Sequence, residues 1–280
     1  MNIRHSVLAL FLLPLSACSE PAPLSSLYAQ TLRAYPAPDA FQAVAVDATH
    51  FYAVNNFSIG RHDKDSGELQ GSWDGVSAKS GPIIHLDSAM VYEGLLYAAH
   101  SNFPQWPMAS SIEVWDVQSM QHLRSHAFVD PLGSMTWLDR YDGFWWGGFG
   151  NYDRIIPPRL QAYGETANTV VVKMDDEFNI LEQWRLPEEL LPRLRPMSNS
   201  GGSWGSDGYL YLTGHDHPEI YVMTIPESGA VLRWETTVMV EGFDGQGIAW
   251  DRDELSPILW GISRADAEVW RLQMPSISLP

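Results

Sequence analysis

The chain has 280 residues, a formal net charge of −17 at pH 7 and a single cysteine. A chain this acidic is not expected to bind nucleic acid or anionic lipid surfaces by electrostatic attraction. Its length and its low share of charged residues, 18%, are compatible with one domain that buries a large core.

Residues 1–17 have the pattern of a secretory signal peptide. Arg4 precedes the apolar run 7–13, and the small residues Ser16 and Ala17 follow it. A positive start, a short apolar stretch and small residues before a cleavage site are typical of a segment that is removed during secretion. The apolar run is also too short to span a bilayer as a helix.

Leu15-Ser16-Ala17-Cys18 resembles the bacterial lipobox. The resemblance implies that Cys18 is lipidated and becomes the mature N-terminus, and that Ser19, in the place of an Asp, directs the protein to the outer membrane. A lone free thiol would be a liability in an oxidising compartment. We therefore expect a lipidated Cys18 with a tether over 18–26 and one domain over 27–280. That domain would face the periplasm and meet the membrane through the lipid only. The alternative is an ordinary signal peptide with a coincidental cysteine.

An apolar run that ends in Asp, turns and restarts as a second apolar run occurs five times in the remaining chain. Self-similarity with a period near 40–50 residues in β-type segments is typical of a β-propeller. The sequence therefore predicts an all-β fold with five four-stranded blades. The longest interval leaves room for a sixth blade within 150–174. The repeated residues are Asp47, Asp87, Asp139, Asp207 and Asp251, at intervals of 40, 52, 68 and 44.

Further strands are predicted after each Asp-marked pair, separated by turn signals such as Asp142-Gly143. The fifth blade lacks an outer strand, because Met274-Pro275 ends the pattern. The unassigned run 28–35 would supply that strand, and closing the ring would remove exposed sheet edges. The predicted third strands are 59–62, 112–116, 169–174, 220–223 and 269–272, and the predicted outer strands are 69–73, 122–128, 181–186 and 231–237.

The repeated Asp residues allow a structural and a catalytic interpretation. An acid beside a tight turn accepts hydrogen bonds from backbone amides and tolerates turn geometry. We expect this structural role for all five, on the turn face of the propeller. The functional residues are then expected on the opposite face.

Most polar loop residues belong to the loops between second and third strands and between blades, which share one face of a propeller. Convergent polar groups on a rigid scaffold are the default candidates for a site. The candidate catalytic residues are His85, His100 and His215. The candidate substrate-binding residues are Asn102, Asn151, Asn199, Asp216 and Gln246.

Three kinds of function fit this set. A histidine of near-neutral pKa beside Asp216 or Asp244 could transfer protons in lactone opening, cyclisation or isomerisation. Polar side chains around a cup could instead bind a sugar or peptide without chemistry. A divalent metal could be bound at the channel mouth, although no pair has close metal spacing on one element. Its ligands would come from His85, His100, His215 and Asp216, with Asn102 or Asn199.

Two local resemblances accompany the repeat. Residues 202–211, with Trp204-Gly205 before Asp207-Gly208, look like a segment of plant-type glutaminyl cyclotransferases, which are five-bladed and of similar length. The match covers one blade, and the Phe-x-x-Gly-Leu start of that family is not found, so its activity is not carried over. Segments 100–104, 110–116 and 197–202 resemble a propeller family sometimes labelled cycloisomerase, a label that assigns no catalytic residue here.

These features predict a lipid-anchored periplasmic propeller with a small polar-metabolite site on its loop-rich face. Its activity would be of the lactonase, cycloisomerase or cyclotransferase type. The alternative is a non-catalytic scaffold at the outer membrane that binds a polar ligand or a periplasmic protein. A deep cup with the three histidines close together would favour the enzyme, whereas a broad apolar patch would favour the scaffold.

Overall fold

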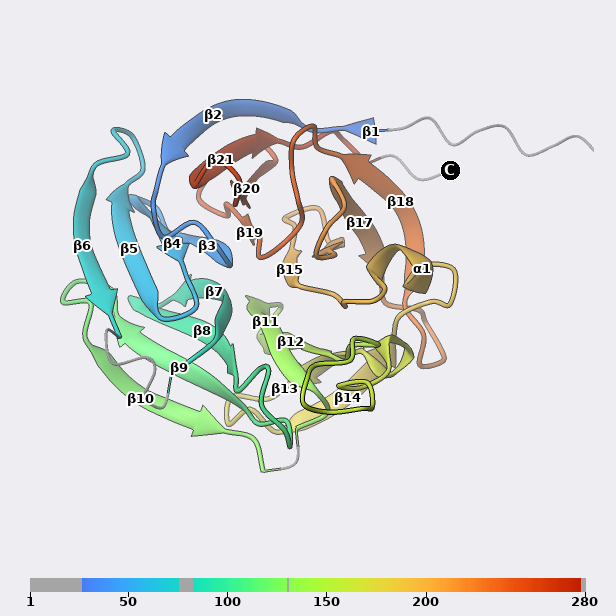
Figure 1. Cartoon of the computed structure of the whole chain (residues 1–280). Coiled ribbons are helices and arrows are strands. Elements are labelled where there is room, and N and C mark those ends of the chain that lie inside the picture. Colours follow the sequence, from blue (N-terminus) through green and yellow to red (C-terminus); the bar gives the residue numbers. More distant parts are fainter. Residues whose placement is uncertain (1–26, 76–82, 130, 278–280) are drawn as a thin grey trace, which may run out of the picture.

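The computed structural model describes residues 27–75, 83–129 and 131–277. Five four-stranded blades form a ring, which confirms the predicted five-bladed β-propeller (Figure 1). Each of the first four blades runs from its inner to its outer strand in chain order. Among the described residues, no helix is both long enough and apolar enough to cross a bilayer.

The strand bounds follow the blades. Blade 1 contains β3 (Ala43–Val46), β4 (His50–Val54), β5 (Ser58–Asp63) and β6 (Leu69–Asp74). Blade 2 contains β7 (Leu86–Tyr92), β8 (Leu95–Ser101), β9 (Ser110–Asp116) and β10 (His122–Ala127). Blade 3 contains β11 (Ser134–Tyr141), β12 (Phe144–Gly150), β13 (Val170–Met174) and β14 (Ile180–Arg185).

Blade 4 contains β15 (Gly201–Trp204), β16 (Leu210–Thr213), β17 (Glu219–Thr224) and β18 (Arg233–Met239). Blade 5 contains β19 (Ala249–Trp250), β20 (Ile258–Ser263), β21 (Glu268–Gln273) and β2 (Gln30–Pro36). The short elements are β1 (Leu27–Tyr28), a 3-10 helix (Thr166–Asn168) and α1 (Leu191–Leu194). The segment considered for a sixth blade is instead a long loop between β12 and β13, with one isolated bridge between Ile155 and Ala162.

The N-terminal strand closes the ring as predicted. β2 pairs antiparallel with β21, from Gln30 opposite Gln273 to Pro36 opposite Glu268. β1 pairs in parallel with β18, so the first described residues join blades 4 and 5. Tyr35 is the buried residue of β2 and stacks on Trp260 at 5.6 Å between ring centroids. The closing strand therefore contributes both backbone pairing and a core aromatic ring.

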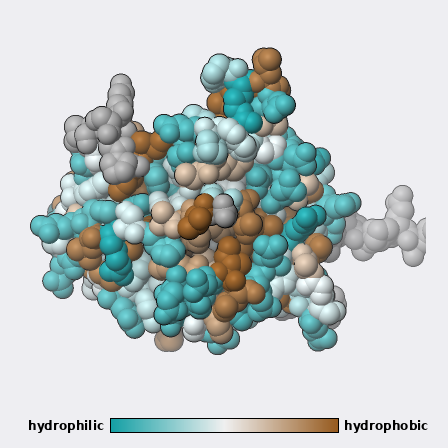
Figure 2. Space-filling view, turned by 90° about the horizontal axis from the view of Figure 1, so that it is seen from below, coloured by the Kyte–Doolittle hydropathy of each residue, from teal (hydrophilic) through white to brown (hydrophobic). Residues whose placement is uncertain are grey.

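Inner and middle strands are buried on both faces because each blade packs between two neighbours. Strands of this kind read as nearly continuous apolar runs, as in β4 and β8. Large aromatic rings fill the space between blades, and Trp115, Trp137 and Trp260 are fully buried. Outer strands are mostly exposed, and on the wall of the ring apolar side chains form a narrow strip between polar areas (Figure 2).

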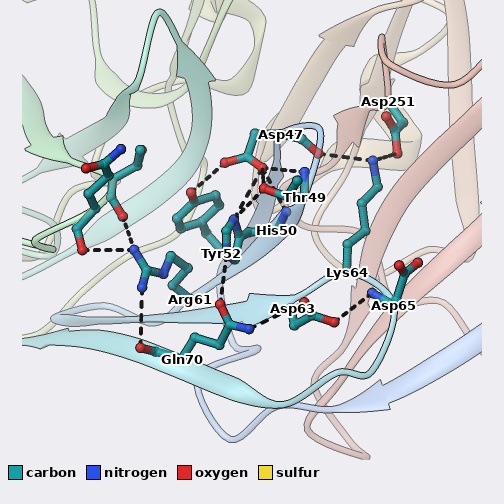
Figure 3. A network of polar contacts seen from close by, with 12 residues as sticks. Asp47, Thr49, His50, Tyr52, Arg61, Asp63, Lys64, Asp65, Gln70 and Asp251 are labelled. Atoms are coloured by element: carbon teal, nitrogen blue, oxygen red, sulfur yellow. Dashed lines mark hydrogen bonds and ion pairs between the residues drawn. The ribbon is translucent and has the colours of Figure 1, made fainter.

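Four of the five repeated Asp residues have the predicted structural role on the turn face. Asp47 accepts hydrogen bonds from the amides of Thr49 and His50 and from the Tyr52 hydroxyl, the last at 2.6 Å (Figure 3). Lys64 joins the carbonyl of Asp47 to Asp251 of blade 5, with 2.7 Å between Nζ and Oδ2 (Figure 3). Hydrogen-bonded carboxylates of this kind tie turns to strands and one blade to the next.

The prediction for Asp87 is wrong. The inner strand of blade 2 starts at Leu86 and runs to Tyr92, and its turn is Glu93-Gly94. Asp87 therefore lies at the start of the strand, on the face opposite the other four. The apolar residues that follow it belong to the same strand, so the repeat in this blade is displaced toward the C-terminus.

The centre of the ring is closed just below the loop-rich face. Ser88 of blade 2 donates a hydrogen bond to the carbonyl of Ser200 of blade 4, at 3.4 Å, although these blades are not neighbours. The amide of Gly247 donates to the carbonyl of Gln42 at 2.9 Å. A Cβ at Gly247 would lie 2.3 Å from that of Ala43, so only glycine permits this approach. A ligand at this face consequently meets a floor rather than an open channel.

Candidate functional site

The loop-rich face brings together polar side chains from blades 2, 4 and 5 at the mouth of the closed channel. His85 precedes β7, and Asp87 is the second residue of that strand. His215 lies between β16 and β17, Asp244 between β18 and β19, and Arg264 between β20 and β21. Because every inner strand starts on this face, the topology places all five residues at the same end of the ring.

Asp87 is a buried carboxyl group with a free hydrogen-bonding atom. The residue is 7% exposed, and its Oδ2 atom is buried without a hydrogen-bond partner in the described structure. Burial raises the pKa of Asp87 well above its usual value, and the charge of Arg264 opposes this shift only in part. Since unpartnered buried polar groups are destabilising, they mark positions where a ligand can complete the hydrogen bonding.

His85 lies next to Asp87 and is kept neutral. Its Nε2 atom is 3.6 Å from Oδ1 of Asp87, and its ring packs against Phe103 at 5.2 Å. Burial, together with smaller contributions from the positive charges of His100, Arg264 and His215, lowers the pKa of His85 to about 4. A neutral imidazole beside a carboxyl group of raised pKa can accept a proton while the carboxyl group donates one.

Arg264 projects into the same mouth and bonds mainly to uncharged groups. Its Nε donates to the carbonyl of Phe41 at 2.6 Å, and one terminal nitrogen donates to Oε1 of Gln42 at 3.0 Å. The other terminal nitrogen lies 3.4 Å from Nε2 of His215. Within the described part of the chain, Arg264 forms no ion pair with a carboxylate at 4.0 Å or less, and burial lowers its pKa.

His215 and Asp216 form a pair at the rim. Nδ1 of His215 is 2.6 Å from Oδ1 of Asp216, whose side chain is 62% exposed. When Nδ1 donates its proton to Asp216, Nε2 is free to accept a hydrogen bond from Arg264. Of the three candidate histidines, His85 and His215 therefore have side chains at the mouth.

His100 points into blade 2, and both of its ring nitrogens are used. Nε2 accepts a hydrogen bond from the amide of Ile84 at 3.2 Å, so Nδ1 carries the proton and faces the Ser111 hydroxyl at 2.8 Å. Ser111 in turn donates to the buried Glu113 at 2.6 Å. Burial lowers the pKa of His100, against the opposing charge of Glu113. The ring thus has a structural role in joining the start of β7 to β9.

The candidate amide residues Asn102, Asn151, Asn199 and Gln246 hold backbone in place. Asn102 bonds to the carbonyl of Pro107 and the amide of Ala109, which fixes the loop between β8 and β9. Asn151 donates to the carbonyls of Leu132 and Asn168. The side chain of Gln246 donates to the carbonyl of His215 at 3.1 Å, and so it positions the rim histidine.

Asn199 is the most buried of these four amide residues. It is 1% exposed, accepts a bond from the Trp137 indole at 2.5 Å and donates to the carbonyls of Gly201 and Thr213. These contacts use its polar atoms within the protein. Asp216 remains exposed at the rim, where a ligand can reach it.

Sequence reasoning did not select Asp87 and Arg264 as site residues, although they define the mouth. Asp87 stands two positions after His85, a spacing that puts both side chains on one side of an extended chain. Arg264 lies in a loop already assigned to the functional face. No group of three or more histidine, cysteine or acidic side chains that could hold a metal ion occurs among the described residues.

Comparison with known protein families and with curated proteins found no match. Solved structures give matches at low sequence identity. A luciferin-regenerating enzyme is 10% identical, with 89% of this chain and 94% of that one covered and a TM-score of 0.50. A PQQ-bound aldose sugar dehydrogenase from Streptomyces coelicolor is 12% identical, with 92% and 84% covered and a TM-score of 0.49. Likeness at this level of identity shows the β-propeller fold alone.

Proposed function

We propose that this protein is an enzyme that transfers protons on a small polar metabolite at the mouth formed by His85, Asp87 and Arg264. The observation that carries the proposal is the pair at the start of β7, in which a neutral imidazole lies 3.6 Å from a buried, unpartnered carboxyl group. Opposite pKa shifts in two neighbouring titratable groups favour acid–base chemistry over a purely structural role.

Lactone opening is the reaction that uses both groups most directly. Nε2 of His85 takes a proton from water as the water oxygen bonds to the carbonyl carbon. Asp87 gives its proton to the ring oxygen as the carbon–oxygen bond breaks. The proton on His85 then passes to the Asp87 carboxylate, which restores both groups, and the hydroxy acid product ionises in solvent. Cyclisation and isomerisation would use the same two proton transfers in other orders.

A cellular location completes the proposal. Cys18 lies outside the described residues, and its place in a lipobox-like segment supports a lipid anchor at the outer membrane with the propeller in the periplasm. Cys18→Ser in the full-length chain should move the protein from the membrane to the soluble periplasmic fraction. If the Cys18→Ser protein still sediments with outer membranes, the anchor proposal fails.

A non-catalytic binding scaffold is the second candidate, and one observation favours it. Trp106, Ile155 and Leu160, in loops of the same face, are 53%, 56% and 92% exposed. Exposed apolar residues beside a site are typical of protein interaction surfaces. We place the enzyme first because the mouth itself combines a buried, unpartnered carboxyl oxygen of Asp87 with the neighbouring ring of His85.

One experiment separates the two candidates. The full-length protein in detergent would be screened against small lactones and hydroxy acids for thermal stabilisation and for turnover. Asp87→Asn and His85→Gln should keep ligand-induced stabilisation and lose turnover by about 100-fold or more, as expected for general acid–base groups. Asp142→Asn, an exposed change on the turn face, is the control. Ligand binding without turnover in the unchanged protein would favour the scaffold.

A further inference from the structure

Arg264 keeps unused hydrogen-bonding capacity at the mouth. A guanidinium has five N–H donors. The N–H on Nε donates to the carbonyl of Phe41, an N–H on one terminal nitrogen donates to Oε1 of Gln42, and the other terminal nitrogen lies 3.4 Å from Nε2 of His215. One N–H remains on each terminal nitrogen, and two donors on adjacent nitrogens match the two oxygens of a carboxylate.

The guanidinium is held rigidly for such a role. Gln42 donates from Nε2 to Oδ1 of Asn56 at 2.7 Å, so its Oε1 is turned toward Arg264. The Phe41 ring lies 4.8 Å from the guanidinium carbon. A preorganised charged donor loses little conformational entropy when it binds an anion.

Two carboxyl groups near Arg264 need donors rather than cations. Oδ2 of Asp87 and Oδ1 of Asp244 are buried without hydrogen-bond partners in the described structure, and neither residue forms an ion pair at 4.0 Å or less with Arg264. Burial raises the pKa of both groups, and the charge of Arg264 opposes this rise in each, which places the three side chains in one electrostatic neighbourhood. A hydroxyl group would satisfy either oxygen.

We infer that the mouth binds a small hydroxy acid, with its carboxylate on Arg264 and its hydroxyl groups on Asp87 and Asp244. A hydroxy acid supplies a carboxylate acceptor for the free N–H groups of Arg264 and hydroxyl donors for the free oxygens of Asp87 and Asp244. The inference uses the site of the proposed function and names its substrate or product class. A neutral sugar would leave Arg264 unpaired, whereas a cation would meet Arg264 as a like charge.

The test compares acids with their uncharged amides. Gluconate, malate and lactate would be titrated against gluconamide, malamide and lactamide into the full-length protein, with binding measured by calorimetry and by thermal shift. At least one acid should bind about 10- to 100-fold more tightly than its amide, because a hydrogen bond to a charged group is lost in the amide. Equal affinity of every acid and amide would overturn the inference.

Variants assign the preference to Arg264. Arg264→Gln should bind acid and amide alike, and Arg264→Lys should keep a weaker preference because it retains the charge without the planar fork. Arg159→Gln, which removes a guanidinium stacked on Trp106 at 4.0 Å, is the matched control and should keep the full preference. Circular dichroism would confirm that each variant folds. An acid preference that persists in folded Arg264→Gln would also overturn the inference.

The two proposals fail separately. Acid binding without any turnover would contradict the proposed enzyme and leave the ligand class standing. Turnover of neutral compounds with no preference for acids would contradict the ligand class and leave the enzyme standing.

Discussion

Nε2 of His85 lies 3.6 Å from Oδ1 of Asp87, and burial shifts the pKa values of the two groups in opposite directions. Each group disfavours its charged form, so the pair is stable as neutral imidazole and carboxylic acid. Its contributions to folding must then depend on pH with opposite signs.

Acid should destabilise the protein through His85. Its pKa falls from 6.5 to about 4 on folding, so between these values the unfolded chain binds a proton that the folded chain does not. The contribution is present above the unfolded pKa and is lost as pH falls toward the folded one. His85→Gln should remove up to about 3 kcal/mol of this acid sensitivity. Urea unfolding of both proteins across the interval measures it, with the exposed His217→Gln as control. If the free energy of unfolding of the unchanged protein and of His85→Gln depended on pH in the same way, the lowered pKa of His85 would be contradicted.

Asp87 should have the opposite effect. Its folded pKa is raised, so its contribution is present below the unfolded pKa and is lost as pH rises through the folded value. Asp87→Asn should therefore stabilise the protein by about 1–3 kcal/mol near neutral pH, and by less in acid, because Asn removes the cost of protonating a group that is ionised in the unfolded chain at neutral pH. Chemical unfolding at both pH values tests this, with Asp142→Asn as the neutral control. A less stable Asp87→Asn at neutral pH would show that Asp87 holds the fold together.

The fold could be predicted from the sequence because its signals are local. Turn residues such as Asp142-Gly143 mark strand ends, and the run 28–35 had no other place in a closed ring. The prediction for blade 2 is wrong because His85-Leu86-Asp87 resembles the end of an inner strand, while the actual turn, Glu93-Gly94, lacks the Asp. A sequence repeat shows which segments correspond between blades, but it does not fix the position of each strand within its segment.

The site could be predicted only as far as its face. Loop topology follows from strand order, so His85 and His215 were assigned to the correct end of the ring. The sequence does not predict whether a given Asn or Gln binds a ligand or holds backbone in place. Asn199 and Asn151, for example, donate to carbonyls of other loops that are distant in sequence. Arg264 was overlooked for the same reason, since its partners Phe41 and Gln42 are more than two hundred residues away.

Ring closure depends on Tyr35 more than on any other side chain of β2. Tyr35 is 4% exposed and packs on Phe51 and Trp260, whereas Leu32 of the same strand is 42% exposed. Tyr35→Ala should lower the free energy of unfolding by about 3 kcal/mol or more, as for other buried aromatic truncations. Leu32→Ala should change it by roughly 0.5 kcal/mol at most. Denaturant titration of the two variants compares them. Equal losses would mean that backbone pairing with β21 alone closes the ring.

Asn199 should prove to be a stability residue and not a ligand contact. Truncation to Ala removes the acceptor of the Trp137 indole and the donor to the carbonyls of Gly201 and Thr213, all in the buried centre. Each buried group left unsatisfied costs about 1–3 kcal/mol, so Asn199→Ala should destabilise the protein by about 3–5 kcal/mol. Asn179→Ala, on an exposed turn, is the control. If Asn199→Ala had normal stability and weaker hydroxy acid binding, Asn199 would be a ligand contact and not a stability residue.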